Sequence, residues 1–457
     1  MPNKHSIKDI SDSYMEYLCS LSTVKNKIPA EKYSKYNVKR GLRNNNETGV
    51  LVGLTSIGEV SGYIIEDNEK VAVDGRLFYR GIDIKDIADD IEKNKRHGFE
   101  EVIFLLLFGV LPDKEQLKNF KKCLSILRDL PDGFTEDTIL KTPCQNIMIK
   151  LARSVLALYS YDDDAEDTSV VNILKQSIGL IARFPTLAAY GYQAKTHYYD
   201  NKSLYIHTPK AEYSTAENFL HLIRPDNKFT KLEADILDLM FIIHAEHGGG
   251  NNSTFTAHVV SSTGTDIYSA VAAAIGSLKG PKHGGANAKV AEMVANIMEN
   301  VPDWNNDDNI IEYLEKIVSK DAFDRSGLIY GLGHAVYTVS DPRALLLREK
   351  ARELAKEKGR LDEFRVYEAI ERLGPIAFEN VKHSGKEICA NVDLYSGFVY
   401  QMLDIPPELY TPIFALSRIV GWCAHILEET ITGGKIMRPA YKSVSKRIPY
   451  VALEDRK

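Results

Sequence analysis

The sequence has few cysteines, no long apolar run and no excess of positive charge. The five cysteines contain no C-x-x-C pair and lie far apart, at Cys19, Cys123, Cys144, Cys389 and Cys423. This pattern excludes a zinc knuckle and a disulfide framework and is typical of thiols in a reducing cytoplasm. No segment is apolar over the roughly 20 residues that a membrane-spanning helix needs. The formal net charge of -6 gives no general attraction to nucleic acid or to an anionic membrane.

The composition is that of an ordinary globular protein. The chain has 457 residues, of which 44% are hydrophobic and 26% charged, and it is long enough for more than one domain. The first 20 residues carry Asp9, Asp12 and Glu16 and lack an apolar stretch, so they predict neither a signal peptide nor a transit peptide. We therefore expect a cytoplasmic protein.

The N-terminal part changes character twice. Residues 1–45 predict a polar helical segment followed by a basic stretch, for which a solvated surface arm is favoured over a phosphate-binding role. Residues 49–81 contain β-branched runs with alternation and turn signals at Glu66-Asp67-Asn68 and Asp74-Gly75. These features predict a small β-hairpin region.

The remaining sequence predicts a mainly α protein. Residues 99–107 read as a buried helix that ends at Gly109, and Asp266 can cap a helix that continues through Leu278. A helix with Val290, Val294, Ile297 and Met298 on one face should follow. The same period near 3.6 recurs at 310–318, 344–357, 361–373 and 413–427.

Four short motifs gather the residues that suit chemistry. Two of them are glycine-rich turns that carry a histidine. The motifs are Gly280-Pro281-Lys282-His283-Gly284-Gly285-Ala286-Asn287, Gly331-Leu332-Gly333-His334-Ala335-Val336-Tyr337, Asp341-Pro342-Arg343 and Asn391-Val392-Asp393-Leu394-Tyr395-Ser396-Gly397. Alone, each histidine is more often structural than catalytic, so the joint pattern carries the prediction.

A metal site is the alternative use of the histidines. His244 and His247 could share a helical face, and His258 follows nearby. However, the order His-Ala-Glu-His is not the H-E-x-x-H of zinc proteases, and no cysteine or carboxylate completes a ligand set. We therefore predict no metal.

The joint pattern suits an enolisation. A carboxylate beside a carbon acid can remove its proton, and a hydrogen-bond donor can stabilise the carbonyl oxygen where charge develops. Asp393, flanked by small and polar residues, is the candidate base, since partial desolvation would raise its pKa. His283 precedes a helix whose dipole disfavours the imidazolium, so it would act as a neutral donor. Triosephosphate isomerase uses the same pairing.

His334 and several arginines are the candidates for binding the electrophile that the enol would attack. The planar fork of Arg343 matches a carboxylate in a way that lysine cannot. Arg418 lies on an otherwise apolar helix, where a lone arginine is usually snorkelling or paired. Beside Arg343 it becomes a candidate for a second carboxylate clamp. Arg438, in the basic C-terminal segment, would ordinarily be solvated.

These motifs occur in an order that resembles the citrate synthase family, over nearly the whole chain from about Gly41 to Pro439. The Phe78-Tyr79-Arg80-Gly81, Phe99-Glu100-Glu101-Val102 and His244–Phe255 segments belong to the same ordered set. The resemblance implies condensation of acetyl-CoA with oxaloacetate to citryl-CoA, followed by hydrolysis to citrate and CoA. It implies no metal and no prosthetic group, with acetyl-CoA as co-substrate.

The resemblance also assigns roles. His283 would stabilise the enol, Asp393 would take the methyl proton, and His334 would polarise and protonate the oxaloacetate carbonyl. The oxaloacetate side would comprise His247, Asn251, Arg343 and Arg418, with Arg438 reaching into the partner subunit's site of an obligate homodimer. CoA contacts would come from Arg43, Leu332, Gly333 and Lys386. Gln193 and Thr338 depart from basic residues that many members carry, which affects the expected phosphate contacts.

The family architecture implies two domains with the active site in the cleft between them. Residues 1–282 plus 387–457 would form a large helical domain and residues 283–386 a small one. Three alternative functions stay open. A 2-methylcitrate synthase would use propionyl-CoA with the same residues, because one methylene changes binding by only about 1–3 kcal/mol. A non-catalytic binding protein and a structural metalloprotein are more distant alternatives.

Overall fold

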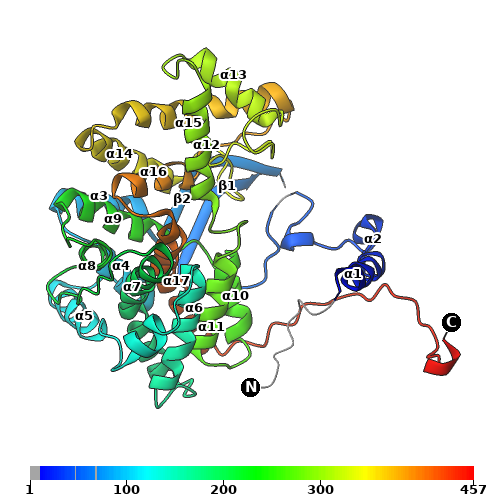
Figure 1. Cartoon of the computed structure of the whole chain (residues 1–457), viewed down its shortest axis with the longest axis horizontal. Helices are drawn as coiled ribbons and strands as arrows, with labels where there is room; N and C mark the ends of the chain where they lie inside the picture. The colour runs from blue at the N-terminus through cyan, green and yellow to red at the C-terminus, as the bar shows by residue number, and fades with distance from the viewer. Residues whose placement is uncertain (1–10, 47, 67–68, 457) are drawn as a thin grey trace. The chain divides into compact units, whose positions relative to one another are not determined.

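The chain divides into two compact units, Met1–Gly53 and Leu54–Lys457, each described here by itself. The computed structural model describes residues 11–46, 48–66 and 69–456, and Figure 1 follows them by colour. The first unit contains α1 (Asp12–Asn26), α2 (Ala30–Lys35) and the short helix η2 (Arg40–Leu42). Ser11 caps α1 by accepting from the Tyr14 amide. The predicted helical start is confirmed from Ser11 onward, and residues 1–10 lie outside the described part.

The second unit is mainly helical, as predicted. Its strands are β1 (Gly58–Glu66), β2 (Glu69–Tyr79) and β3 (Ile82–Asp83). Its α-helices are α3 (Ile84–Asn94), α4 (Phe99–Phe108), α5 (Lys114–Leu127), α6 (Ile147–Leu158), α7 (Val170–Asp200), α8 (Thr215–Ile223), α9 (Lys231–His244), α10 (Asn252–Ser261), α11 (Ile267–Leu278), α12 (Ala286–Asn300), α13 (Asp307–Val318), α14 (Pro342–Glu357), α15 (Leu361–Lys382), α16 (Asp393–Met402) and α17 (Tyr410–Thr432). Short helices are η3 (Thr135–Leu140), η4 (Tyr159–Tyr161), η5 (Pro407–Leu409) and η6 (Leu453–Asp455).

Local signals fix most helix ends. Asp266 caps α11 by accepting from the Ser269 amide, and Gly109, in the left-handed region at φ 77°, ends α4. Helix α15 differs from its prediction, because it continues past Leu373 and through Pro375 to Lys382. Its packing against α13 offsets the hydrogen bond that a proline within a helix removes.

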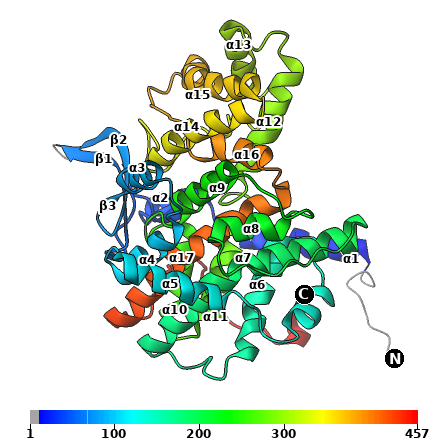
Figure 2. The same ribbon diagram turned by 90° about the vertical axis from the view of Figure 1, so that its left-hand side faces the viewer.

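Within the second unit, helix α17 is central. It packs against α4, α7, α9, α10 and α11, and nearly all of its side chains up to Leu427 are buried. Figures 1 and 2 show α12–α15 gathered at the upper end of this unit, with α5–α8, α10 and α11 below. Helix α16 packs against α12 and α14, and α9 packs against α14. No helix of the described residues is both long and apolar enough to cross a membrane.

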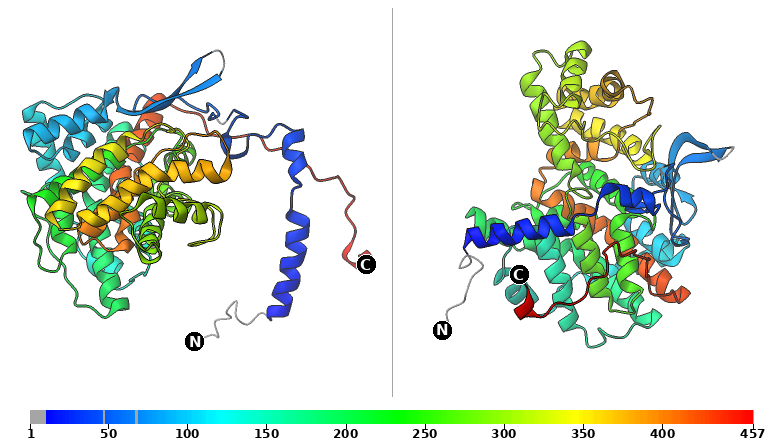
Figure 3. Two further views of the ribbon diagram at one scale, coloured as in Figure 1. Left: turned by 90° about the horizontal axis from the view of Figure 1, so that it is seen from above. Right: turned by 90° about the vertical axis from the view of Figure 1, so that its right-hand side faces the viewer.

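The predicted hairpin exists, but one of its predicted turns is wrong. Strands β1 and β2 pair antiparallel from Gly58 opposite Tyr79 to Glu66 opposite Glu69, and Figure 3 shows them extending beyond the neighbouring helices. The other turn residues, Asp67 and Asn68, lie outside the described residues. Asp74-Gly75 is not a turn: it lies inside β2, where the register shifts opposite the segment between Ser61 and Tyr63.

This bulge brings the sheet against the segment that follows His334. The Gly75 amide donates to Ser340 Oγ at 3.1 Å, and Ser340 Oγ donates to Asp74 Oδ1 at 2.9 Å. A Cβ on Gly75 would lie 2.1 Å from the Ser340 carbonyl oxygen, so only glycine allows this approach. The hairpin therefore supports one wall of the site described next.

Candidate active site

The loop between α9 and α10 holds His247 and Asn251. Helix α9 ends at His244, and Gly248 turns the chain at φ 80°. Asn251 then caps α10, its Oδ1 accepting from the Ser253 amide at 3.3 Å. His247 is buried, and its Nε2 has no hydrogen-bond partner among the described residues. Burial, followed by the charge of Arg343, holds the pKa of His247 well below its usual value.

His283 lies in the turn between α11 and α12. Its Nε2 is 3.1 Å from Asn251 Oδ1 and 3.2 Å from Ser253 Oγ. Gly284 is required here, because a Cβ would lie 2.5 Å from the Leu278 carbonyl oxygen. Burial and then the charge of Arg418 lower the pKa of His283 to about 4. The imidazole is therefore neutral, as predicted, but burial and Arg418 are the causes, where we had expected the helix dipole.

His334 is held in one tautomer by its own loop. Its Nδ1 accepts from the amides of Val336 and Tyr337, both at 3.1 Å. In the neutral ring the proton then resides on Nε2. The ring stacks on Tyr337 with centroids 4.6 Å apart and meets His247 edge-on at 5.1 Å. His334 thus presents an N–H donor beside the two aromatic neighbours.

The two glycines before His334 tie its loop to the segment that leads to Asp393. Gly331 and Gly333 both have left-handed φ, at 87° and 88°. The Asn391 amide donates to the Gly331 carbonyl, and the Asn391 side chain donates to the Gly333 carbonyl, both at 2.8 Å. A Cβ on Gly331 would lie 2.9 Å from Leu394 Cα, so glycine is needed for this contact.

Asp393 begins α16, and its amide donates to Asn391 Oδ1 at 3.0 Å. Burial, opposed by Arg343 and reinforced by Asp341, raises the pKa of Asp393 to about 6. The expected rise is therefore found. A carboxylate with this pKa is ionised near neutrality and is a stronger base than an exposed aspartate.

Arg343 is already paired inside the protein. Its Nε donates to Asp341 Oδ1 at 3.1 Å and its Nη2 to Asp341 Oδ2 at 2.8 Å, and both side chains are buried. Asp341 also caps α14. Asp341 belongs to the Asp341-Pro342-Arg343 motif, but no role was predicted for it; its spacing of two from Arg343 at a helix start was the available signal. Asp341 orients the guanidinium and balances its charge.

Arg418 is fully buried, which excludes a snorkelling side chain and leaves a paired arginine or a carboxylate clamp as the alternatives. Its Nε donates to the His244 carbonyl at 2.8 Å, and its carbon Cζ lies 4.7 Å from the centre of the Phe414 ring. Nη1 and Nη2 have no hydrogen-bond partner among the described residues. Two unpartnered N–H-bearing nitrogens on a buried cation are costly unless an anion binds them.

One face of α17 packs against His283 and the segment from His244 to Ser253, and of its residues the sequence predicted only Arg418. Phe414 packs edge-on against His244 and His283. Trp422 Nε1 donates to Ser253 Oγ at 3.1 Å. His425 Nε2 lies 3.1 Å from Glu246 Oε1. Their spacing of four or seven residues from Arg418, one or two helical turns, was the only signal in the sequence.

Gly421 lies on this face, and we expect Gly421→Ala to destabilise the protein. A Cβ there would lie 2.3 Å from Glu246 Oε2 and 2.6 Å from the Ala245 carbonyl oxygen. Overpacking of this kind costs about 1–3 kcal/mol, so the thermal midpoint should fall. The control is Gly276→Ala in α11, where the added Cβ would meet no atom of the described residues within 4 Å beyond its chain neighbours and its own helix backbone, and alanine favours the helix. Equal melting temperatures for the two variants, measured at one protein concentration, would show that the contact does not constrain α17.

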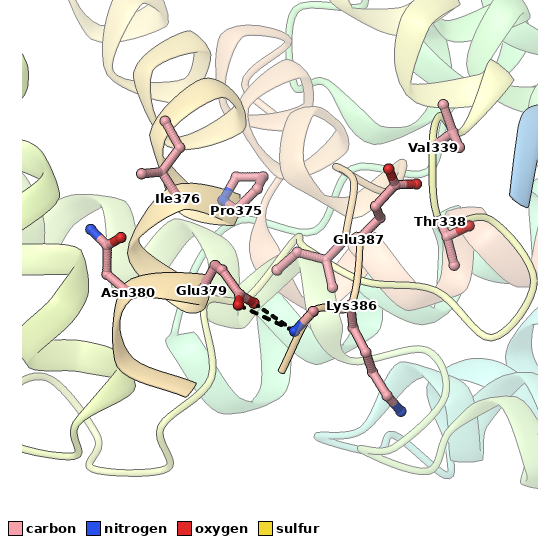
Figure 4. A pocket seen from close by; sticks show the side chains of 10 residues that line it. Thr338, Val339, Pro375, Ile376, Glu379, Asn380, Lys386 and Glu387 are labelled. Carbon is pink, nitrogen blue, oxygen red and sulfur yellow. Dashed lines mark hydrogen bonds between the residues drawn. The ribbon is translucent and has the colours of Figure 1, made fainter. Parts of the chain in front are cut away.

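Other predicted site residues lie elsewhere. Arg438 is exposed in the segment after α17, and Arg43 belongs to the first unit, where its backbone pairs with Gly49. Lys386 and Thr338 line a cavity of about 640 Å³, with Pro375, Glu379 and Ile388 among its other walls (Figure 4). Leu332, in the His334 loop, bridges to Ala390.

Gln193 requires a correction. Its side chain is buried in α7, and Nε2 donates to the Ile223 carbonyl at 3.0 Å. It therefore has no access to a phosphate group. The three histidines of the metal alternative make separate contacts: His244 Nδ1 meets the Met240 carbonyl and His258 Nε2 meets His425. Within the described residues, no three His, Cys, Asp or Glu side chains are arranged to hold a metal ion.

The chain matches the family model described as citrate synthase, C-terminal domain, over residues 45–440. It is 34% identical to citrate synthase of Haloferax volcanii, covering 92% of this chain and 99% of that protein. It is 31% identical to 2-methylcitrate synthase of Shewanella oneidensis, covering 81% and 90%. Among solved structures, citrate synthase of Pyrobaculum aerophilum matches with TM-score 0.71 and 30% identity over 89% of this chain and 94% of that one.

A further structure is the ternary complex of citrate synthase from Thermoplasma acidophilum with carboxymethyl coenzyme A and oxaloacetate. It matches with TM-score 0.73 and 26% identity over 92% of this chain and 99% of that one. The fold and site define a mainly helical protein with a carboxylate of raised pKa, histidines of lowered pKa and two buried arginines. The chain belongs to the citrate synthase family. It is accordingly an acyltransferase of the citrate synthase type.

Proposed function

We propose that the chain condenses acetyl-CoA with oxaloacetate to citryl-CoA and hydrolyses this intermediate to citrate and CoA. The observation that carries the proposal is a set of buried nitrogens to which the described residues offer no hydrogen-bond partner: Arg418 Nη1 and Nη2, and His247 Nε2. Buried polar groups are normally hydrogen-bonded, and these three flank the Arg343 and His334 side of the site. A small keto-dicarboxylate supplies the acceptors that they lack.

In the first step, Asp393 removes a proton from the acetyl methyl group. The thioester carbonyl becomes an enol oxygen, and the neutral His283 stabilises it by donating a hydrogen bond. Ser253 Oγ accepts from Trp422 Nε1 at 3.1 Å and lies 3.2 Å from His283 Nε2. Ser253 Oγ donates to Asn251 Oδ1 at 2.9 Å, and this Oδ1 lies 3.1 Å from His283 Nε2, so the two side chains together orient the imidazole.

In the second step, the enol carbon attacks the ketone carbon of oxaloacetate. His334 Nε2–H donates to the ketone oxygen and gives it a proton as the new carbon–carbon bond forms, and the methyl proton that Asp393 took restores the imidazole before the next turnover. Arg343 and Arg418, with His247 and Asn251 alongside, bind the oxaloacetate carboxylates and hold the ketone toward the enol. Water then cleaves the thioester of citryl-CoA, which releases citrate and the CoA thiol. No step requires a prosthetic group.

We assign the acyl-CoA to the side of the site that carries Lys386. The cavity in Figure 4 adjoins the segment after His334 and is lined by Thr338, Val339 and Lys386. A cavity of about 640 Å³ has the volume of a small-molecule site. Leu332 and Gly333 would offer backbone groups to the CoA, and Lys386 would contact its phosphates. The Thermoplasma acidophilum enzyme, which binds carboxymethyl coenzyme A, supports this assignment by similarity.

The architecture that we propose follows the family. Residues 1–282 with 387–457 form the large domain and residues 283–386 the small one, and their cleft closes over oxaloacetate. Closure would exclude water from the enol. Arg438 reaches into the active site of the partner subunit, so the enzyme is a homodimer. We also propose that it is cytoplasmic. The exposed, extended position of Arg438 after α17 suits such a contribution.

The alternative function, 2-methylcitrate synthesis, differs from citrate synthesis in the acyl-CoA that the enzyme prefers. The similarity to the Shewanella oneidensis 2-methylcitrate synthase keeps propionyl-CoA as the second candidate. We expect oxaloacetate-dependent release of CoA thiol with a higher kcat/KM for acetyl-CoA than for propionyl-CoA. A propionyl-CoA preference would move the assignment to 2-methylcitrate synthesis by the same residues. Lack of release with both would contradict the proposed function.

A further inference from the structure

Glu246 is a buried acid behind the site that the proposed steps do not use. It is fully buried, between Ala245 and His247. Its Oε1 accepts from the Gly248 amide and lies 3.1 Å from His425 Nε2. Its Oε2 has no hydrogen-bond partner among the described residues. Although burial alone would raise the pKa of Glu246, His425 and Arg418 bring it below the usual value. The side chain is therefore an anion at neutral pH.

Glu246 and Arg418 meet at Gly421. The position of a Cβ on Gly421 would be 2.3 Å from Glu246 Oε2 and 3.5 Å from Arg418 Cδ. The two side chains therefore lie close together in the protein interior. Yet Glu246 Oε2 and both Nη atoms of Arg418 find no hydrogen-bond partner in the described part of the chain. The carboxylate thus balances the charge of Arg418 without occupying the nitrogens that would bind a ligand.

The other buried cation nearby is already balanced. Arg343 forms an ion pair with Asp341, with Nη2 and Oδ2 2.8 Å apart. Arg418 is therefore the cation whose charge depends on Glu246. Burial lowers the pKa of Arg418 to about 10, against the opposing effect of Glu246. Without a neighbouring anion, a buried charge of this kind is strongly destabilising.

We infer that Glu246 is the resident counter-charge of Arg418 and limits the affinity of the site for the dicarboxylate. This inference rests on the proposed function. The incoming carboxylate must share Arg418 with an anion that stays in place, so substrate and tricarboxylate product are held less tightly than the bare arginine would hold them. Removing the charge of Glu246 should therefore tighten ligand binding and weaken the ligand-free protein. A merely structural role for Glu246 would have the opposite effect on binding, since a disturbed loop binds less well.

The variant Glu246→Gln distinguishes a counter-charge role of Glu246 from a merely structural one. Glutamine keeps the shape and an oxygen for Gly248 and His425, and its amide nitrogen would lie near the Ala245 carbonyl. We expect the Kd of oxaloacetate, measured by titration calorimetry without acyl-CoA, to fall at least about tenfold, as loss of a unit charge a few ångströms away predicts. Inhibition by citrate should strengthen in parallel. An unchanged or higher Kd would overturn the inference.

The matched control is Glu429→Gln, which removes the same charge further along α17. The Glu429 carboxylate lies 3.6 Å from His258 Nδ1, and its loss should leave the oxaloacetate Kd unchanged; an equal tightening would show a general charge effect and refute the role of Glu246. If Glu246→Gln is unfolded without ligand, oxaloacetate should restore its near-ultraviolet circular dichroism. Failure to refold at a concentration that saturates the wild type would also refute it. Wild-type protein that binds no oxaloacetate would instead contradict the proposed function.

Discussion

Asp393→Asn should lower kcat by on the order of 10²–10⁴-fold, the range for loss of a general base. Asparagine keeps the size of the side chain and the start of α16 but cannot take a proton. Oxaloacetate binding should change little, because the arginines and His247 remain. The matched control is Asp404→Asn, just after the same helix, where the side chain is exposed and φ is 54°. Asparagine tolerates that conformation, so turnover should be unchanged.

The pH dependence gives a second test of Asp393. Its pKa is about 6, and only the ionised carboxylate can accept the methyl proton. Turnover should therefore be full above this pKa and fall as the pH drops through it. His283, with a pKa of about 4, stays neutral over that range, so its titration adds no further change to the pH profile of turnover. A profile that stays flat below pH 6, or an Asp393→Asn enzyme with wild-type kcat, would exclude Asp393 as the base.

Arg418→Lys should raise the KM of oxaloacetate strongly and leave the KM of the acyl-CoA nearly unchanged. Lysine keeps the charge beside Glu246 but lacks the planar fork and the Nε bond to the His244 carbonyl. Breaking a buried charge-assisted contact costs roughly 2–5 kcal/mol, which corresponds to about 30-fold or more in KM at 1.4 kcal/mol per tenfold change.

A second buried arginine supplies the control for this prediction. Arg128 is also buried, but its Nη1 donates to the carbonyls of Lys210 and Tyr213, away from the site. Arg128→Lys should lower thermal stability without changing either KM. If both variants lose oxaloacetate affinity alike, the effect of Arg418 would be a general loss of packing, and its role as a carboxylate ligand would have to be abandoned.

Much of the fold could be predicted because its signals are local. Caps such as Asp266, stops such as Gly109 and the 3.6-residue period depend on neighbouring residues. The turn assigned to Asp74-Gly75 failed because the need for glycine comes from Ser340, far along the chain. Helix α15 exceeded its prediction because packing against α13 outweighs the local signal of Pro375.

In the candidate site, too, the features with local signals could be predicted and those that depend on long-range contacts could not. His283, His334, Arg343 and Asp393 lie in short motifs whose residue types suggest their chemistry. Their environments could not be read from those motifs. The low pKa of His283 depends on burial and Arg418, and the partner of His425 is 179 positions away. The burial of Arg418 likewise depends on how α17 packs, so its apolar neighbours in sequence gave an ambiguous signal.

Enolisation by Asp393 is tested by mass spectrometry of the product made from oxaloacetate and acetyl-CoA with a fully deuterated methyl group. If Asp393 removes one methyl deuteron and the resulting enol attacks the ketone, each citrate should retain two deuterons and appear with one free CoA thiol. Release of the thiol without oxaloacetate, together with acetate that keeps all three deuterons, would mean simple thioester hydrolysis. That result would contradict the account.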